Sequence, residues 1–156
     1  MGKFFVAFSN FTTSTSNKTA VKLIGRSGTI YEVVEVAMYG AGTATAVDVQ
    51  HQVNAGFLTN GVLGSAGVSN IIPERFNQLG QSALMSAATG FTVEPTAYNT
   101  NVFQLFSFNQ RGGMRWAVPR GEGFITGDGA TALSFGVRVQ SASAGNVDGV
   151  THYWEG

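Results

Sequence analysis

The sequence has no cysteine among its 156 residues. Disulfides, thiolate zinc sites, iron–sulfur clusters and cysteine nucleophiles are therefore excluded. A chain of this length can fold without such links, because a single domain of about 150 residues buries roughly 68–70% of the surface that its unfolded chain exposes. We expect residues 1–156 to form one domain around an apolar core.

Charged side chains are also scarce, since Asp, Glu, Lys and Arg make up 12% of the chain. The usual share is roughly 25%. Nine acidic and nine basic residues give a formal net charge of zero. Proteins that bind nucleic acid or a membrane surface usually have a basic excess, so we expect neither partner. A net charge near zero favours association, which suits a protein that packs against other proteins.

Long apolar runs are absent as well. The N-terminal apolar run, Phe4 to Phe8, is too short for the apolar region of a signal peptide. No stretch approaches the length of a membrane span. We therefore expect synthesis in the cytoplasm of the producing cell.

The chain is rich in glycine and phenylalanine, with 21 and 12 residues, and poor in the residues that favour helices. Apolar and polar residues alternate in segments 47–53, 114–118 and 133–139, and Phe4, Val6 and Phe8 share one face. Further strands are expected over 20–24, 91–94, 102–108, 123–126 and 150–154. About ten short strands joined by glycine-rich turns predict an all-β antiparallel sandwich in one domain, and specifically a jelly roll.

Segment 29–39 has the composition of a strand without its regular alternation. Glu32 and Glu35 fall on opposite faces of an ideal strand, and apolar residues occur on both. Either a bulge shifts the register, or a neighbouring subunit covers the second face. The sequence leaves both interpretations open.

Segment 58–90 is long and rich in Gly, Asn and Ser. A helical turn is expected over 73–79, with Pro73 at its start. Because long loops without secondary structure are usually functional or disordered, we interpret the segment as an excursion that reaches a partner through Pro73, Arg75 and Phe76. A loop folded back on its own sandwich is the alternative.

The residues needed for chemistry do not form a recognisable motif. The glycines from Gly121 to Gly127 are followed by neither the lysine nor the helix of a phosphate-binding loop. His51 and His152 lie in expected strands, and no Gly-x-Ser-x-Gly motif is present. The nine acids are scattered along the chain. We expect no enzyme, no cofactor and no metal site; an enzyme would require one histidine to meet a carboxylate in a pocket.

The densest cluster of basic residues lies between Asn109 and Arg120. Arg111, Arg115 and Arg120 fall there with no acid among them. Arginine and tryptophan are enriched at interface hot spots, so one interpretation is a contact patch for an acidic protein surface. The alternative is a hairpin in which Arg115 faces solvent and Trp116 fills the core.

Several aromatic residues could stack on a sugar, although most aromatic side chains in a β-sandwich belong to its core. The candidates are Phe103, Phe106, Phe108, Phe124, Tyr153 and Trp154.

Four motifs carry a resemblance to a known family. They are Thr92–Thr96, Leu105–Arg111, Met114–Pro119 and Gly121–Gly123, and the ending His152–Glu155 also fits. Together they resemble the small all-β head decoration proteins, or cement proteins, of tailed bacteriophages. The resemblance implies a dimer or trimer that binds the major capsid protein on the outside of the shell and staples its subunits together. The protein would then be located on the capsid surface of the virion.

The residues and the resemblance agree on a capsid cement protein. The N-terminal segment and segment 58–90 are the expected contacts. The alternative is a receptor-binding or glycan-binding domain of a phage tail fibre or spike, which would share the same composition. A surface aromatic pair beside Asn and Asp would favour that alternative.

Overall fold

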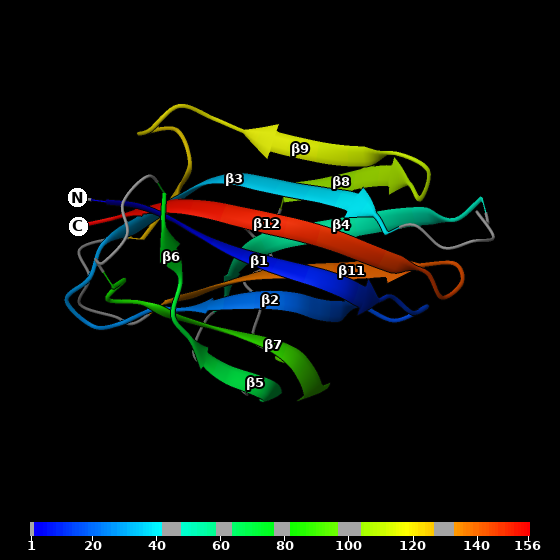
Figure 1. Ribbon diagram of the computed structural model, residues 1–156, viewed down its shortest axis with the longest axis horizontal. Coiled ribbons are helices and arrows are strands. Elements are labelled where there is room, and N and C mark those ends of the chain that lie inside the picture. Colours follow the sequence, from blue (N-terminus) through cyan, green and yellow to red (C-terminus); the bar gives the residue numbers. More distant parts are fainter. Residues whose placement is uncertain (1, 42–47, 59–63, 77–81, 97–103, 127–132) are drawn as a thin grey trace.

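The computed structural model describes residues 2–41, 48–58, 64–76, 82–96, 104–126 and 133–156, which form twelve strands and no helix (Figure 1). No helix in this part of the chain could span a membrane. The strands are β1 (Gly2–Thr12), β2 (Lys18–Ile24), β3 (Tyr31–Gly40), β4 (Gln50–Leu58), β5 (Ser65–Ile71), β6 (Glu74–Arg75), β7 (Ser86–Val93), β8 (Gln104–Asn109), β9 (Gly113–Ala117), β10 (Phe124–Ile125), β11 (Ser134–Ser141) and β12 (Asn146–Glu155). All expected strands have a counterpart here, while Val47, Val102 and Phe103 lie outside the described residues.

The strands form two antiparallel sheets that pack face to face (Figure 1). The first sheet runs β3-β12-β1-β6, and β9 and β10 pair one after the other with the free edge of β3. The second sheet runs β5-β7-β2-β11-β4-β8. The all-β sandwich expected from the sequence is confirmed.

The order in which the strands pair is that of a jelly roll. Strand β1 pairs with β12 in one sheet, and β2 pairs with β11 in the other. The next pairs are β12 with β3 and β11 with β4, followed by β3 with β9 and β4 with β8. Two four-stranded sheets with this order, β1-β12-β3-β9 and β2-β11-β4-β8, are the eight strands of a jelly roll.

Strands β5, β6 and β7 are an insert between β4 and β8 of the roll. Strands β7 and β5 extend the second sheet beyond β2, and β6 pairs with β1 at Phe4 and Phe5. The described part of segment 58–90 therefore folds back on its own sandwich, as the alternative expected, and it forms strands where the sequence predicted a long loop. The helical turn expected over 73–79 is wrong at Glu74 and Arg75, which form β6; residues 77–79 lie outside the described part.

The core lies between the sheets and is rich in aromatic rings. Phe57 packs edge-to-face against Phe124 and Phe135, with ring centroids 6.1 and 5.7 Å apart. Phe4 stacks on Tyr153 at 5.8 Å. Full burial of a side chain such as Phe stabilises the fold by about 1.5–3 kcal/mol. The inward faces of strands from both ends of the chain thus close one core.

The irregular pattern of β3 is explained by a bulge. His152 of β12 lies opposite Glu35, yet the next residue, Tyr153, lies opposite Val33. Val34 is the extra residue, and it shifts the register by one. As a result Glu32 and Glu35 both face outward from the first sheet. The bulge interpretation is confirmed, and the pattern needs no neighbouring subunit.

Candidate functional site

A row of side chains crosses the outer face of the first sheet at the end where both termini lie. Ile125 of β10 is opposite Glu32 of β3, Glu32 is opposite Trp154 of β12, and Trp154 is opposite Lys3 of β1. Because residues opposite one another project to the same side of a sheet, these four side chains share one surface.

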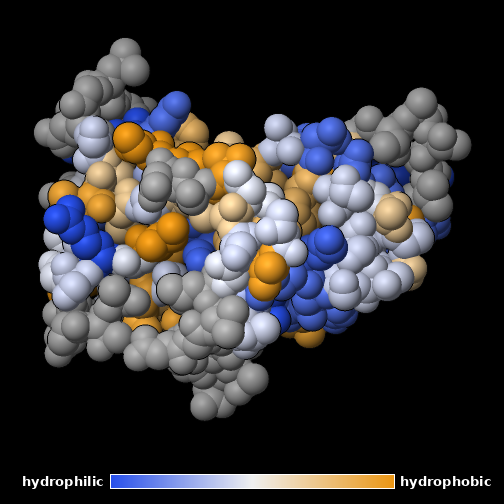
Figure 2. Space-filling model, turned by 90° about the horizontal axis from the view of Figure 1, so that it is seen from below, coloured by the Kyte–Doolittle hydropathy of each residue, from blue (hydrophilic) through white to orange (hydrophobic). Residues whose placement is uncertain are grey.

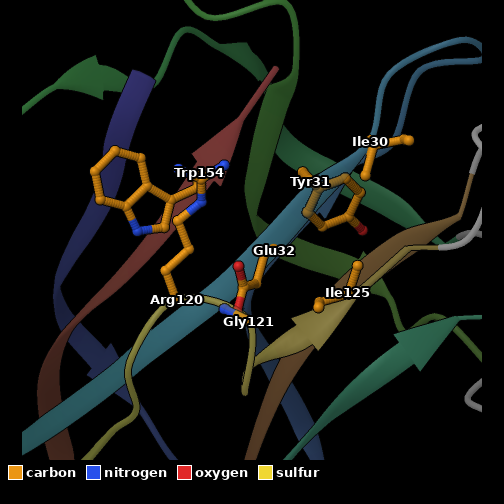
Figure 3. Close-up of a pocket in the computed structure, with 7 residues that line it drawn as sticks. All are labelled: Ile30, Tyr31, Glu32, Arg120, Gly121, Ile125 and Trp154. Carbon is orange, nitrogen blue, oxygen red and sulfur yellow. The ribbon is translucent and has the colours of Figure 1, made fainter. Parts of the chain in front are cut away.

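A pocket of about 400 Å³ lies on this row (Figure 3). The turn between β9 and β10 carries Arg120 over the indole of Trp154, with the guanidinium carbon 5.5 Å from the ring centroid. Such a cation–π contact contributes about 0.5–1 kcal/mol at an exposed site. The lining residues are Ile30, Tyr31, Glu32, Arg120, Gly121, Ile125 and Trp154.

Glu32 fixes the glycine-containing turn that forms one wall of the pocket. Its Oε1 accepts hydrogen bonds from the backbone N–H groups of Gly121 and Gly123, at 2.6 and 2.9 Å. Gly121 has a φ of 94°, which L side chains rarely adopt, and a Cβ at Gly123 would overlap the carbonyl oxygen of Val33. The glycines that resembled a phosphate-binding loop therefore bind a carboxylate of the same chain.

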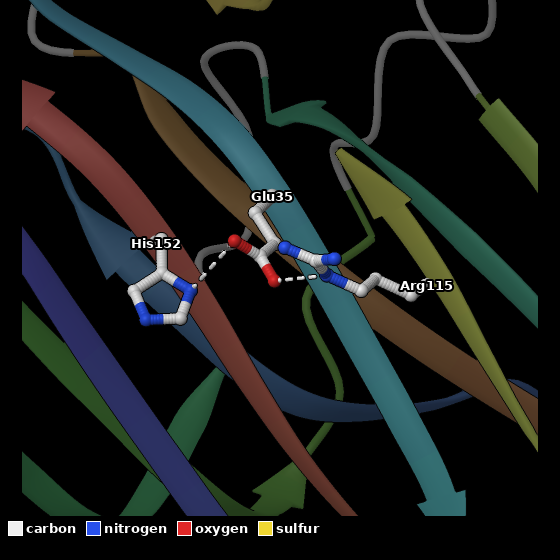
Figure 4. Close-up of polar contacts among 3 residues, drawn as sticks. All are labelled: Glu35, Arg115 and His152. Atoms are coloured by element: carbon white, nitrogen blue, oxygen red, sulfur yellow. Dashed lines mark hydrogen bonds and ion pairs between the residues drawn. The ribbon is translucent and has the colours of Figure 1, made fainter. Parts of the chain in front are cut away.

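A second polar cluster lies one row further along the same face (Figure 4). Arg115 Nε donates to Glu35 Oε1 at 2.7 Å, and His152 Nδ1 lies 3.3 Å from Glu35 Oε2. The hydrogen bond from Arg115 lowers the pKa of Glu35. Burial lowers the pKa of His152, although the Glu35 carboxylate favours its charged form.

This cluster contains the histidine–carboxylate contact that an enzyme would need. The His152 ring lies between Phe5 and Phe76, with centroids 5.8 Å from each. No hydroxyl group in the described part of the chain hydrogen-bonds to His152. Within the described residues, the cluster therefore consists of His152, Glu35 and Arg115.

The insert exposes five large apolar residues and buries others, among them Met85 and Phe91. The N–H groups of Leu84 and Met85, which precede β7, donate to the buried Glu155 carboxylate at 2.6 and 3.0 Å. Lys3 Nζ lies 5.0 Å from the ring centroid of Phe76.

Figure 2 shows apolar side chains gathered toward the end with the termini, and hydrophilic ones toward the other end. The exposed apolar residues of the insert are Val68, Ile72, Phe76, Leu84 and Val93.

The three clustered arginines do not form one patch. Arg111 lies in the turn after β8, where its N–H donates to Asn109 Oδ1 at 2.9 Å. Arg115 binds Glu35, and Arg120 lies over Trp154 at the opposite end of β3. The expectation of a single contact patch is not met, because the extended chain spreads the three residues along the sheet.

The predicted hairpin around these arginines is also wrong. Strand β8 pairs with β4 in the second sheet, whereas β9 pairs with β3 in the first. The chain between them crosses from the second sheet to the first. Trp116 packs against Phe106 and Phe124, with centroids 6.4 and 5.1 Å apart, which is the core role that the alternative gave it.

The contacts expected from segment 58–90 differ in exposure. Pro73 is buried, Arg75 is half-buried in β6, and Phe76 is exposed. Of these three residues, Phe76 presents the largest apolar surface to a partner.

The aromatic residues considered for sugar binding lie mainly in the core. Phe108, Phe124 and Tyr153 are buried, and Phe106 packs against them. Trp154 lines the pocket, but none of the residues around it is Asn or Asp. Ile30, Glu32 and Ile125 were missed by sequence reasoning, although an isoleucine on the outward face of a strand was a usable signal.

The described residues contain no group of three or more His, Asp or Glu side chains that could hold a metal ion.

No family model matches the chain, and no curated protein matches it. Among solved structures, it is similar to a chain of T=1 particles derived from infectious bursal virus, with 13% identity over 98% of this chain and a TM-score of 0.21. It is also similar to a chain of infectious bursal disease virus strain Gx, with 10% identity over 97% and a TM-score of 0.20. The protein spans only 39% and 40% of those two chains. Likeness at this level supports no conclusion about function.

Proposed function

We propose that this chain is a structural protein of a tailed-phage virion, which decorates the outside of the head and binds the major capsid protein as a dimer or trimer. Its role is to stabilise contacts between capsid subunits, without catalysis. The observation that carries the proposal is the exposed apolar surface of the insert between β4 and β8.

The insert is an addition to the eight strands of the jelly roll, and it carries five of the nine large apolar residues that are exposed in the described part of the chain. Leu84 is 56% exposed and Ile72 is 65% exposed. Removing such surface from water gains about 25 cal/mol per Å², from which the entropic cost of association is subtracted. A chain with a net charge of zero has little electrostatic repulsion to oppose that contact.

A repeated shell would strengthen a weak contact. When a decoration protein is itself a dimer or trimer, binding of one subunit places the next near its own site, so the overall affinity exceeds that of each contact. The proposal therefore requires only a modest patch on each protomer.

The test is co-sedimentation of the purified chain with heads of the phage that encodes it, after the native copy has been removed. We expect saturable binding at a fixed ratio to capsid subunits and greater resistance of the heads to heat. Absence of binding would contradict the proposal and favour the alternative, a receptor-binding or glycan-binding domain of a tail fibre or spike.

A matched pair of variants locates the contact. Leu84→Asp should weaken head binding by at least tenfold, because it places a charge in the apolar patch. Leu105→Asp is the control, since Leu105 is 58% exposed but lies on β8, outside the insert. Equal losses in both variants would rule out the insert as the docking surface.

A further inference from the structure

The pocket between Trp154 and Ile125 has the size and lining of a ligand site. Small-ligand pockets occupy about 300–1,000 Å³ and combine an apolar lining with a few placed polar groups. This one has a volume of about 400 Å³. Ile30 and Ile125 are 40% and 47% exposed, so apolar surface remains available to an occupant.

The charges around the pocket indicate the sign of the occupant. Arg120, the basic residue that lines the pocket, lies over Trp154, whereas Lys3, opposite Trp154 on β1, has its ammonium over Phe76. The one carboxylate that lines the pocket, Glu32, already accepts two backbone N–H groups. A guanidinium has five N–H donors and a planar face, so Arg120 can donate to a carboxylate in addition to the contacts that it already makes.

We propose that this pocket binds a segment of a partner protein in which an aliphatic or aromatic side chain stands next to a carboxylate. The apolar side chain enters between Ile30, Ile125 and Trp154, and the carboxylate meets Arg120 at the rim. The identity of the partner rests on the proposed function, whereas the binding chemistry does not.

Two small probes separate the apolar and anionic parts of this site. N-acetyl-phenylalanine carries the ring and the carboxylate, and N-acetyl-phenylalaninamide carries the ring alone. Binding is followed by the indole N–H signals of ¹⁵N-labelled protein. The chain has two tryptophans, and Trp154→Phe assigns them. Trp116, packed in the core, is the internal control.

We expect saturable shifts of the Trp154 signal, with a dissociation constant on the order of 1 mM for the acid and at least tenfold weaker binding of the amide. Arg120→Gln should bring the two probes to equal affinity. Ile125→Ser should weaken both. Arg111→Gln is the control and should change neither, because Arg111 lies in the turn after β8.

Absence of a saturable Trp154 shift with either probe would overturn the site. Equal affinity of acid and amide in the unaltered protein would overturn its anionic part. Failure of head binding with intact probe binding would refute the proposed function alone, and head binding that is unaffected by Arg120→Gln and Ile125→Ser would place the partner elsewhere.

Discussion

The two ends of the jelly roll use different chemical groups for the hydrogen bonds that hold the chain together. At the end with the termini, buried carboxylates bind backbone N–H groups, as Glu32 does at the pocket and Glu155 does at the insert. At the opposite end, the buried bonds join neutral groups, and the carboxylate of Asp148 accepts the N–H of Asn10 at 2.6 Å at an exposed position. Thr13 and Ser141 share a hydrogen bond between hydroxyls of 2.7 Å, and Asn146 donates to Asn10 at 2.8 Å.

The outer surfaces of the two ends also differ in polarity. The pocket near the termini is lined by isoleucine and tryptophan, whereas a depression toward the opposite end is lined by glutamine and serine, including Gln50, Gln52 and Ser107. An apolar surface gains from being covered by a partner, while an amide-rich surface is already well solvated. We therefore propose that docking takes place at the end with the termini.

The largest effect is expected at Glu155, which is 4% exposed. Glu155→Gln replaces an ionised acceptor of two backbone N–H groups by an amide that can accept through one oxygen only. Since hydrogen bonds to charged groups contribute about 1.5–3 kcal/mol, urea denaturation should show a loss of about 2–4 kcal/mol in the free energy of unfolding. The exposed acid Glu74, changed to Gln, should lose less than about 0.5 kcal/mol. Similar losses in both would refute the anchoring role of Glu155.

At the opposite end the corresponding change is Thr13→Val. It keeps the shape of the side chain but removes the hydroxyl that bonds to Ser141 and donates to the carbonyl oxygen of Gly145 at 3.0 Å. We expect a loss of about 1–2 kcal/mol in the same denaturation experiment. The exposed Thr12, changed to Val, is the matched control. A loss at Thr13 as large as that at Glu155 would show that the buried carboxylate stabilises the fold no more than the buried hydroxyl does.

A third prediction concerns acid stability. His51 is fully buried without a hydrogen-bond partner among the described residues, and burial lowers its pKa. The unfolded chain binds a proton below the ordinary value of 6.5, while the folded chain resists it, so stability is complete above that pH and falls as the pH drops below it. His51→Phe should flatten this fall between pH 7.5 and 5. An unchanged pH profile would show that His51 does not contribute to it.

The smallest effects are expected for exposed leucines. Leu84→Ser and Leu105→Ser should each change the free energy of unfolding by less than about 0.5 kcal/mol, because both side chains are already more than half exposed. Urea denaturation of the two variants measures this. A loss of 2 kcal/mol at Leu84 would mean that the insert uses it for folding, which would remove it from the docking surface.

The fold was predictable because alternation is a local signal. Val49, His51 and Val53 alternate with glutamines, and all three are buried, the last two on β4. The turn after β8 includes Gly112 and ends at Gly113, where β9 begins. The register of β3 was only partly predictable, since a bulge at Val34 depends on the partner strand β12 and leaves both interpretations open in the sequence.

The site was less predictable, because it depends on contacts between residues that are distant in the chain. Glu155 meets Leu84 across 71 positions, and Glu32 meets Gly121 across 89. No local pattern contains such pairs. The strands of the insert were not predicted, because Gly, Ser and Asn are typical of loops, yet β7 pairs with the edge of β2 and β5 pairs with β7.

The most direct test of the docking end is hydroxyl-radical footprinting of the protein, free and bound to stripped phage heads. The account predicts that binding protects Ile72, Phe76 and Leu84 of the insert and leaves Tyr39 and Leu105 as reactive as in the free protein. Protection of Tyr39 and Leu105 with no change in the insert would contradict the assignment of docking to the end with the termini.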